Sequence, residues 1–225
     1  LQAAEPALRF DVGGAEAGGA AAIKLLATLT LMAVAPALVL SMTSFTRLIV
    51  VFSLLRQAVG VQQAPPNQVL IGLALFLTLF IMAPTLAEVE QRAYDPFIAG
   101  EISTTEALEQ GSIPMREFML KQTRDKDLGL FYQVSGKPKP TTVEEVPMLV
   151  VIPAYILSEL KTAFEIGFLI YIPFLIVDML IASVLMSMGM MMLPPVVVSL
   201  PFKLLLFVMI DGWFLIVGTL IQSFA

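Results

Sequence analysis

The sequence MLIASVLMSMGMMMLPPVVVSLPF occupies residues 179–202 and contains no charged side chain. A helix of roughly 20 apolar residues is long enough to cross the hydrocarbon core of a bilayer. Residues 62–87 form a second uncharged stretch of similar length. Over all 225 residues 58% are hydrophobic and 14% are charged, whereas soluble domains contain about 25% charged residues. The sequence therefore predicts an all-α membrane protein or a subunit of a membrane complex.

The composition also excludes several kinds of chemistry. The chain contains neither Cys nor His, which removes disulfides, thiolate and imidazole metal sites, and nucleophiles that need a Cys or a His base. A net charge of -5 without a basic cluster argues against nucleic-acid binding. No phosphate-binding loop of the G-x-x-x-x-G-K type is present. We therefore expect no catalytic residues, no metal and no cofactor.

Changes in composition divide the chain into four parts. The expected parts are a flexible N-terminus (1–22), an N-terminal helical hairpin region (23–87), a polar helical subdomain (88–147) and C-terminal helical hairpins with a Met-rich loop (148–225). The first residue is Leu1, which fits a mature product whose signal peptide was removed, and fits a shortened sequence equally well.

Proline and glycine positions predict where helices end. The sequence APPN at 64–67 is expected to end a helix, because proline removes a backbone donor and disfavours helix in the residue before it. For the same reason we expect interruptions at Pro153 and Pro173, at the double proline 194–195, and at Pro201.

The polar part, residues 88–147, contains 11 acidic and seven basic residues, most of the charge in the chain. Ser103 followed by Glu106 predicts a helix N-terminus, and residues 111–114 (GSIP) predict a break between two helices. Residues 134–147 are expected to be an extended link. Together these features predict a small, water-exposed helical subdomain.

Loop charges indicate an orientation. Arg47 and Arg56 lie between the first two apolar blocks, and bases in short loops tend to stay in the cytoplasm. That would place residues 88–147 on the outer side. The bases within 88–147 do not agree with this placement, although long segments translocate largely regardless of charge.

Charges in the apolar C-terminal part are expensive in lipid, so they are expected to face protein, water or each other. Lys161 and Glu165 are four residues apart and can pair on one helix face. Asp178 and Lys203 lie at comparable depth on opposite arms of a hairpin that turns near residues 190–195. Such a pair is either structural or part of a proton or ion relay.

Five of the 13 methionines fall between Met186 and Met192, directly before two prolines. Methionine is flexible and polarizable, so a cluster at a hairpin tip can pack into changing space and close a pore by contact between thioethers. Filling of a membrane core is the other interpretation of the same cluster.

Several long stretches resemble one known family. They are SMTSFTRLIVVFSLLRQAVG (41–60), PPNQVLIGLALFLT (65–78), REFMLKQTRDKDLGLF (116–131), VIPAYILSELKTAFEIGF (151–168), LIYIPFLIVDMLIASVLMSMGMMMLPP (169–195) and LPFKLLLFVMIDGW (200–213). The chain resembles the FliP family of flagellar type III export-gate proteins over nearly all of its length, the first 22 residues excepted. The virulence injectisome has a homologous counterpart, and PFIAGEISTTEAL (96–108) is more similar to the flagellar branch.

The resemblance implies kinked helical hairpins that assemble into a closed helical gate in the bacterial inner membrane, at the flagellar basal body. It implies about five copies of the chain, joined by FliQ and one FliR, with FlhB, FlhA and the assembly factor FliO as further partners and with lipid around the complex. Unfolded flagellar export substrates would pass through the pore. Much of the gate would lie on the periplasmic side, and the energy would come from partners.

The resemblance also assigns residues. Met190, Met191 and Met192 match the pore gasket, with Met186, Met188 and Gly189 as support and Pro194 and Pro195 at the hairpin turn. Asp178 and Lys203 match the charged pair of the family's hairpin and are interpreted as structural charges, as are Lys161 and Glu165 because of their spacing. Phe118, Phe131 and Glu159 are candidates for contacts between subunits.

Two other functions stay open. A proton-coupled membrane transporter would use Glu165, Asp178, Lys203 and Asp211, although no duplicated halves of the kind found in many transporters are visible in the sequence. An assembly scaffold with an incidental pore is the second.

Overall fold

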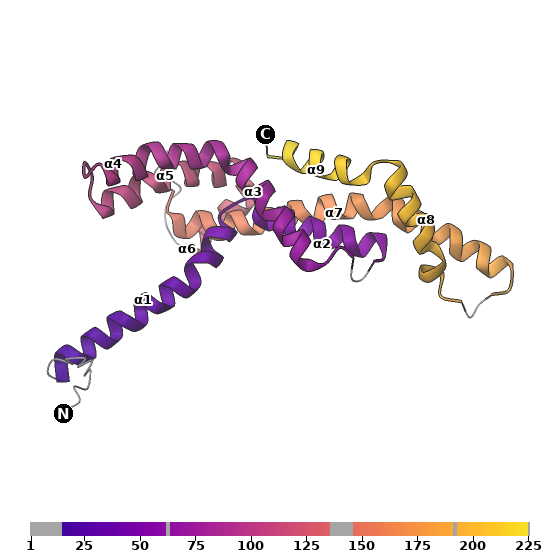
Figure 1. The fold of residues 1–225 in the computed structure, drawn as a ribbon, viewed down its shortest axis with the longest axis horizontal. Coiled ribbons are helices and arrows are strands. Elements are labelled where there is room, and N and C mark those ends of the chain that lie inside the picture. The colour runs from indigo at the N-terminus through magenta and orange to yellow at the C-terminus, as the bar shows by residue number, and fades with distance from the viewer. Residues whose placement is uncertain (1–14, 62–63, 136–145, 191–192, 225) are drawn as a thin grey trace, which may run out of the picture. The chain divides into compact units, whose positions relative to one another are not determined.

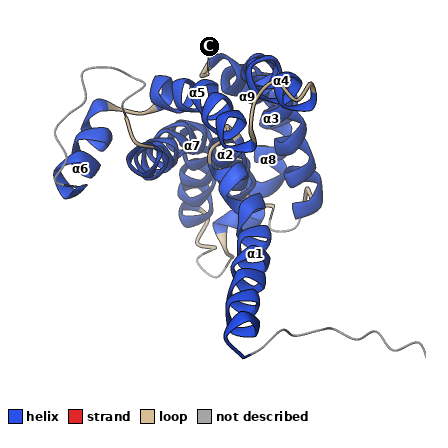
Figure 2. Cartoon of the chain, turned by 90° about the vertical axis from the view of Figure 1, so that its left-hand side faces the viewer, coloured by secondary structure: helices blue, strands red, loops and turns tan. Residues whose placement is uncertain are grey.

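The computed structural model describes residues 15–61, 64–135, 146–190 and 193–224, with side chains described from Ala22 onward. Nearly all of these residues are helical and none of them is in a β-strand (Figures 1 and 2), which confirms the all-α prediction. The chain divides into two compact units, Leu1–Val39 and Leu40–Ala225. The first unit holds most of one apolar helix, in which no side chain from Ala22 to Val39 is buried.

The helices follow one another in a simple order. They are α1 (Ala15–Ser41), α2 (Phe45–Val59), α3 (Asn67–Val89), the π-helix η1 (Glu90–Tyr94), α4 (Asp95–Ile98), α5 (Thr104–Gln122), α6 (Asp125–Ser135), α7 (Met148–Ser187), α8 (Pro195–Met209) and α9 (Gly212–Gln222). Helix α1 already begins at Ala15, inside the expected N-terminal segment 1–22.

Two of the predicted helix boundaries are confirmed. Gly60 ends α2 in the left-handed conformation, with φ of 86°, and Pro66 precedes α3, so the APPN segment separates two helices. Ser103 starts α5 with a capping box: its side chain accepts a hydrogen bond from the Glu106 N–H, and the Glu106 carboxylate accepts one from the Ser103 N–H.

Four predicted breaks are wrong. Helix α7 continues for 40 residues through Pro153 and Pro173, and α8 continues through Pro201. In apolar helices of this kind, neighbouring helices and local adjustments satisfy the backbone groups that a proline leaves free. Helix α5 likewise continues through 111–114 and ends only at Gln122. Gly111 serves packing here, because a Cβ added to it would lie 3.3 Å from Ala93 Cβ on the neighbouring η1.

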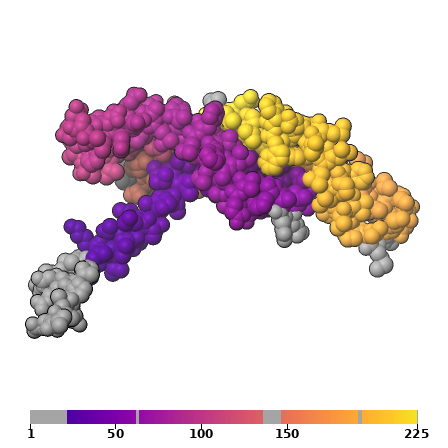
Figure 3. All heavy atoms as spheres, in the orientation of Figure 1, coloured from indigo at the N-terminus to yellow at the C-terminus, as the bar shows by residue number. Residues whose placement is uncertain are grey.

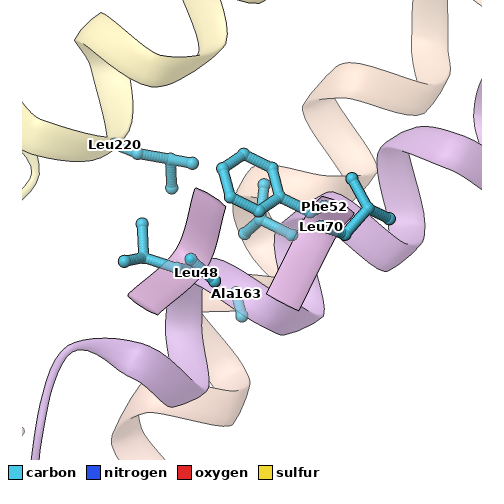
Figure 4. Packing of buried hydrophobic residues seen from close by; sticks show 7 residues of the cluster. Leu48, Phe52, Leu70, Ala163 and Leu220 are labelled. Atoms are coloured by element: carbon cyan, nitrogen blue, oxygen red, sulfur yellow. The ribbon is translucent and has the colours of Figure 1, made fainter. Parts of the chain in front are cut away.

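Helix α2 lies at the centre of the second unit, between α3 and α7. Its fully buried Leu48 and Phe52 pack with Leu70 of α3, Ala163 of α7 and Leu220 of α9 (Figure 4). This cluster joins segments up to 172 residues apart in the sequence, and burial of each such large apolar side chain contributes about 1.5–3 kcal/mol.

A second cluster joins α5 and α6 to the first half of α7. It contains Met119 of α5, Tyr132 of α6, and Val150, Val151 and Tyr155 of α7. Residues of the polar segment 88–147 therefore share a hydrophobic core with α7.

Among the described residues, three helical stretches are long and apolar enough to cross a membrane: Ala22–Ser41, Asn67–Ile98 and Met148–Ser187. Helices α8 and α9 together pass the same test but are bent by 62° at their junction. These lengths are compatible with an inner-membrane location.

Candidate functional site

The tip of the α7–α8 hairpin carries the predicted methionine cluster. Helix α7 ends when Gly189 adopts a left-handed conformation with φ of 73°, and the Met190 N–H donates to the Leu185 carbonyl at 3.0 Å. Helix α8 then begins with Pro195, directly after Pro194. Proline suits the first helical position because its missing N–H would have no intrahelical partner there. The structure thus places a hairpin turn at the predicted residues.

The side chains at this tip are apolar and exposed. Met186 and Met188 are 61% and 62% exposed and Met190 is 42% exposed, while Met191 and Met192 lie outside the described residues. Figure 3 shows the hairpin end, in orange, extending beyond the packed centre of the second unit. The exposed parts of the Met186, Met188 and Met190 side chains are flexible apolar surface that is available to another molecule.

Below the tip, the two hairpin arms are joined by the predicted charged pair. Lys203 Nζ lies 2.6 Å from Asp178 Oδ2, and Ser199 Oγ donates to Asp178 Oδ1 at 2.5 Å. Lys203 Nζ also donates to the Ala58 carbonyl of α2 at 3.2 Å. The Lys203 side chain is 4% exposed and that of Asp178 28%. The predicted pairing is confirmed, and the pair also fastens the hairpin to α2.

The remaining predicted charges do not join this pair. Lys161 Nζ and Glu165 Oε1 are 3.6 Å apart on α7, with both side chains more than half exposed. Asp211 is exposed at the α8–α9 bend. In the part of the chain that the structure describes, no three acidic side chains come together. Asp178 and Lys203 bond to each other, to Ser199 and to the Ala58 carbonyl, so within the described residues no second acid bonds to this pair.

Arg47 forms a buried cluster that sequence reasoning missed. Its guanidinium donates to Glu159 Oε2 and Oε1 at 2.9 and 2.5 Å, and to Gln122 Oε1 at 3.0 Å. It also donates to the carbonyl and the hydroxyl oxygen of Ser223 at 2.8 and 2.9 Å, and lies 3.7 Å from the Phe224 ring centroid. The cluster joins α2, α5, α7 and the residues after α9.

Two interpretations of the sequence change with this cluster. Arg47 is 2% exposed, so it is not a loop base at a membrane surface. Glu159, a candidate for contacts between subunits, is fully buried against Arg47, so its carboxylate makes a contact within the chain. One feature of the sequence could have predicted the burial of Arg47: it directly precedes Leu48, which lies on the buried apolar face of α2.

The two aromatic contact candidates are half-buried in the same region. Phe118 packs edge-on against Tyr155 at 6.1 Å and stacks with Phe224 at 6.3 Å between ring centroids. Phe131 packs against the cluster around Met119 and Tyr132. Both rings therefore have partners within the chain.

Helix α6 is anchored to α7 by a polar contact. Asp127 Oδ2 accepts hydrogen bonds from Ser158 Oγ and from an Arg124 Nη2, each at 2.6 Å. Burial by itself raises the pKa of Asp127, but these two hydrogen bonds and the charges of Arg124 and Lys161 outweigh it and bring the pKa below its ordinary value. The carboxylate is thus held in its charged form.

Comparison with known proteins identifies the family. A family model described as the FliP family matches residues 28–220. The flagellar biosynthetic protein FliP of Bacillus subtilis is 56% identical over 202 residues, covering 90% of this chain and 91% of its own. The protein of the same name from Aquifex aeolicus is 50% identical over 97% of this chain and 92% of its own length. The chain therefore belongs to the FliP family, whose members are structural components of the flagellar export apparatus and not enzymes.

Proposed function

We propose that several copies of this chain, with FliQ and FliR, form the pore through which unfolded flagellar proteins cross the inner membrane. The methionine tips of the α7–α8 hairpins would meet around the pore and close it as a gasket. The observation that carries the proposal is the tip itself, where the exposed Met186, Met188 and Met190 lie on either side of the left-handed Gly189, on a hairpin whose arms are joined by Asp178 and Lys203.

The physical properties of the tip support a gasket. An apolar constriction excludes hydrated ions by dewetting. Flexible thioethers can separate for a chain of varied side chains and then pack together again. The rigid charged pair would hold each tip in position while the methionines move.

The exposed apolar surface supports an assembly. Large apolar side chains are exposed along α1, α3, α7, α8 and α9, more than a monomer in water carries on its surface. Lipid and neighbouring subunits would cover this surface, with about five copies in the ring. FlhB, FlhA and FliO are the further partners that we propose, and the tip would lie toward the periplasmic side.

The gasket can be tested by ion leakage. Replacing Met190, Met191 and Met192 together with alanine is expected to leave the assembly with FliQ and FliR intact while raising ion conductance of the closed gate. The matched control replaces Met179 and Met209 with alanine in the same way. These two side chains are 63% and 75% exposed but lie away from the tip, so the conductance is expected to stay unchanged. Unchanged conductance in the tip variant would contradict the gasket and favour a scaffold role.

The assembly is tested separately by native mass of the detergent-extracted chain, expressed with and without FliQ and FliR. A discrete complex of several copies is expected in the presence of the partners. A monomer or dimer under both conditions would contradict the gate and leave the methionines as core filling.

A further inference from the structure

A cavity of about 430 Å³ lies between the α2–α3 turn and the α8–α9 bend. Its size falls within the ~300–1,000 Å³ of sites that hold small molecules. The wall is almost entirely apolar and includes Phe52, Leu55, Val59, Leu204, Phe207 and Trp213. It shares Phe52 and Leu70 with the central cluster of Figure 4, so one wall of the cavity is the core itself.

The bend that forms this cavity depends on two residues. Asp211 adopts a left-handed conformation with φ of 50°, which turns the chain sharply between α8 and α9. A Cβ on Gly212 would lie 2.3 Å from the Phe207 ring, so only glycine permits the close approach. The cavity is therefore a built feature of the fold.

One charged side chain, Arg56, lines this apolar cavity. It is half-buried, and its Nη1 donates to Asn67 Oδ1 at 2.5 Å. Within the described ranges no carboxylate lies at ion-pair distance from Arg56, whereas the buried Lys203 nearby is already paired with Asp178. Arg56 thus has a charge that the chain itself does not neutralise there.

We propose that this cavity binds an anionic phospholipid, with acyl chain carbons against the apolar wall and the phosphate at Arg56. The guanidinium is well suited to phosphate because its donors match two phosphate oxygens at once. Asn67 begins the apolar helix α3, so the Arg56–Asn67 pair lies at the end of a candidate membrane span, where lipid head groups are found. An apolar wall with one cation at its edge matches an amphiphile with one anionic end.

The single tryptophan of the chain reports on this site directly, because Trp213 lines the cavity. The full chain is reconstituted in nanodiscs of unlabelled phosphatidylcholine with increasing amounts of a phospholipid carrying brominated acyl chains, which quench tryptophan on contact. Brominated phosphatidylglycerol is expected to reach half-maximal quenching at a mole fraction several-fold lower than brominated phosphatidylcholine. A preference on the order of fivefold is the size expected of one interfacial arginine.

Two variants separate a specific site from general lipid contact. Arg56→Gln is expected to abolish the preference for the anionic lipid, while Lys161→Gln, which removes an equally charged but exposed side chain, is expected to keep it. Leu204→Phe, which narrows the cavity without changing Arg56, is expected to reduce quenching by both lipids.

Equal quenching by the two lipids in the unmodified chain would overturn the proposal. Absence of quenching would also overturn it, because the cavity would then be closed to lipid by protein. The result does not depend on the methionine gasket, which is tested by conductance with Arg56 intact.

Discussion

Two charged pairs of the second unit, Arg47–Glu159 and Lys203–Asp178, have similar chemistry and different positions. Arg47 and Glu159 are 2% and 0% exposed, and Arg47 bonds to three other segments of the chain. Lys203 is equally buried, but its partner Asp178 is 28% exposed at the side of a hairpin. The first pair is thus part of the core that holds α2, α5 and α7 together, whereas the second joins the two arms of the α7–α8 hairpin. The two pairs therefore differ in whether both partners are buried and in how many segments they join. We expect the pair that is buried on both sides and joins more segments to contribute more to the stability of the fold.

The largest effect is expected from Glu159→Ala. It leaves the Arg47 charge buried without a carboxylate, a change that costs about 3–5 kcal/mol. Because the net stability of a domain is only about 5–15 kcal/mol, we expect poor accumulation in the membrane and a strongly lowered unfolding midpoint in detergent. Glu159→Gln, which keeps a hydrogen-bond acceptor, is expected to be less damaging. If the unfolding midpoint of Glu159→Ala were close to that of the unmodified chain, the Arg47–Glu159 pair would not be more important for stability than the Lys203–Asp178 pair.

The second pair is expected to give a smaller and compensable effect. Lys203→Met leaves Asp178 with Ser199 and partial access to solvent, so we expect a loss of about 2 kcal/mol. Combining it with Asp178→Asn removes the unpaired charge, and the double variant is expected to be more stable than Lys203→Met alone.

A double-mutant cycle on unfolding, together with flagellar export in cells, measures this compensation. Export that survives the double variant but not the single ones supports a structural pair. Loss of export in the double variant with unchanged stability would support a proton relay instead.

The third prediction concerns pH. The folded pKa of Asp127 is below its ordinary value, so its contribution to stability is present above about pH 4 and is lost as the pH falls through the lowered folded pKa. Asp127→Asn is expected to cost about 1 kcal/mol at pH 7, because the charge-assisted contact to Ser158 and Arg124 is weakened. Unfolding midpoints of both proteins at pH 7 and in acid are the measurement. The difference between the two unfolding midpoints should be smaller in acid than at pH 7. A difference that does not change with pH would contradict the role of the charged Asp127 carboxylate in stability.

The smallest effect is expected at the exposed pair on α7. Lys161 and Glu165 are 3.6 Å apart and more than half exposed, so replacing Lys161 by alanine should change stability by a few tenths of a kcal/mol at most. This variant is the surface control for the two buried pairs. If this variant lost as much stability as Lys203→Met, the exposure of an ion pair would not predict how much the pair contributes to stability.

The proline positions show how far a local pattern extends. The prolines at 64–67 and 194–195 do separate helices as predicted. Pro66 is the residue before α3, and Pro195 is the first residue of α8, where a proline needs no partner for its missing N–H. Pro114, Pro153, Pro173 and Pro201 lie inside helices, against prediction. Whether an interior proline breaks a helix depends on which neighbours satisfy the freed carbonyl, and local sequence does not contain that information.

The sequence by itself determined the membrane class, the helical fold, the hairpin turn at Pro194–Pro195 and the pairing of Asp178 with Lys203. These follow from hydropathy, proline position and helical spacing, all of which act over short distances along the chain. Only the tertiary structure decided the partners of Arg47, the internal role of Glu159 and the cavity beside Trp213. The Arg47 contacts join residues 75 to 176 positions apart, and no local periodicity specifies which distant side chains meet once helices pack.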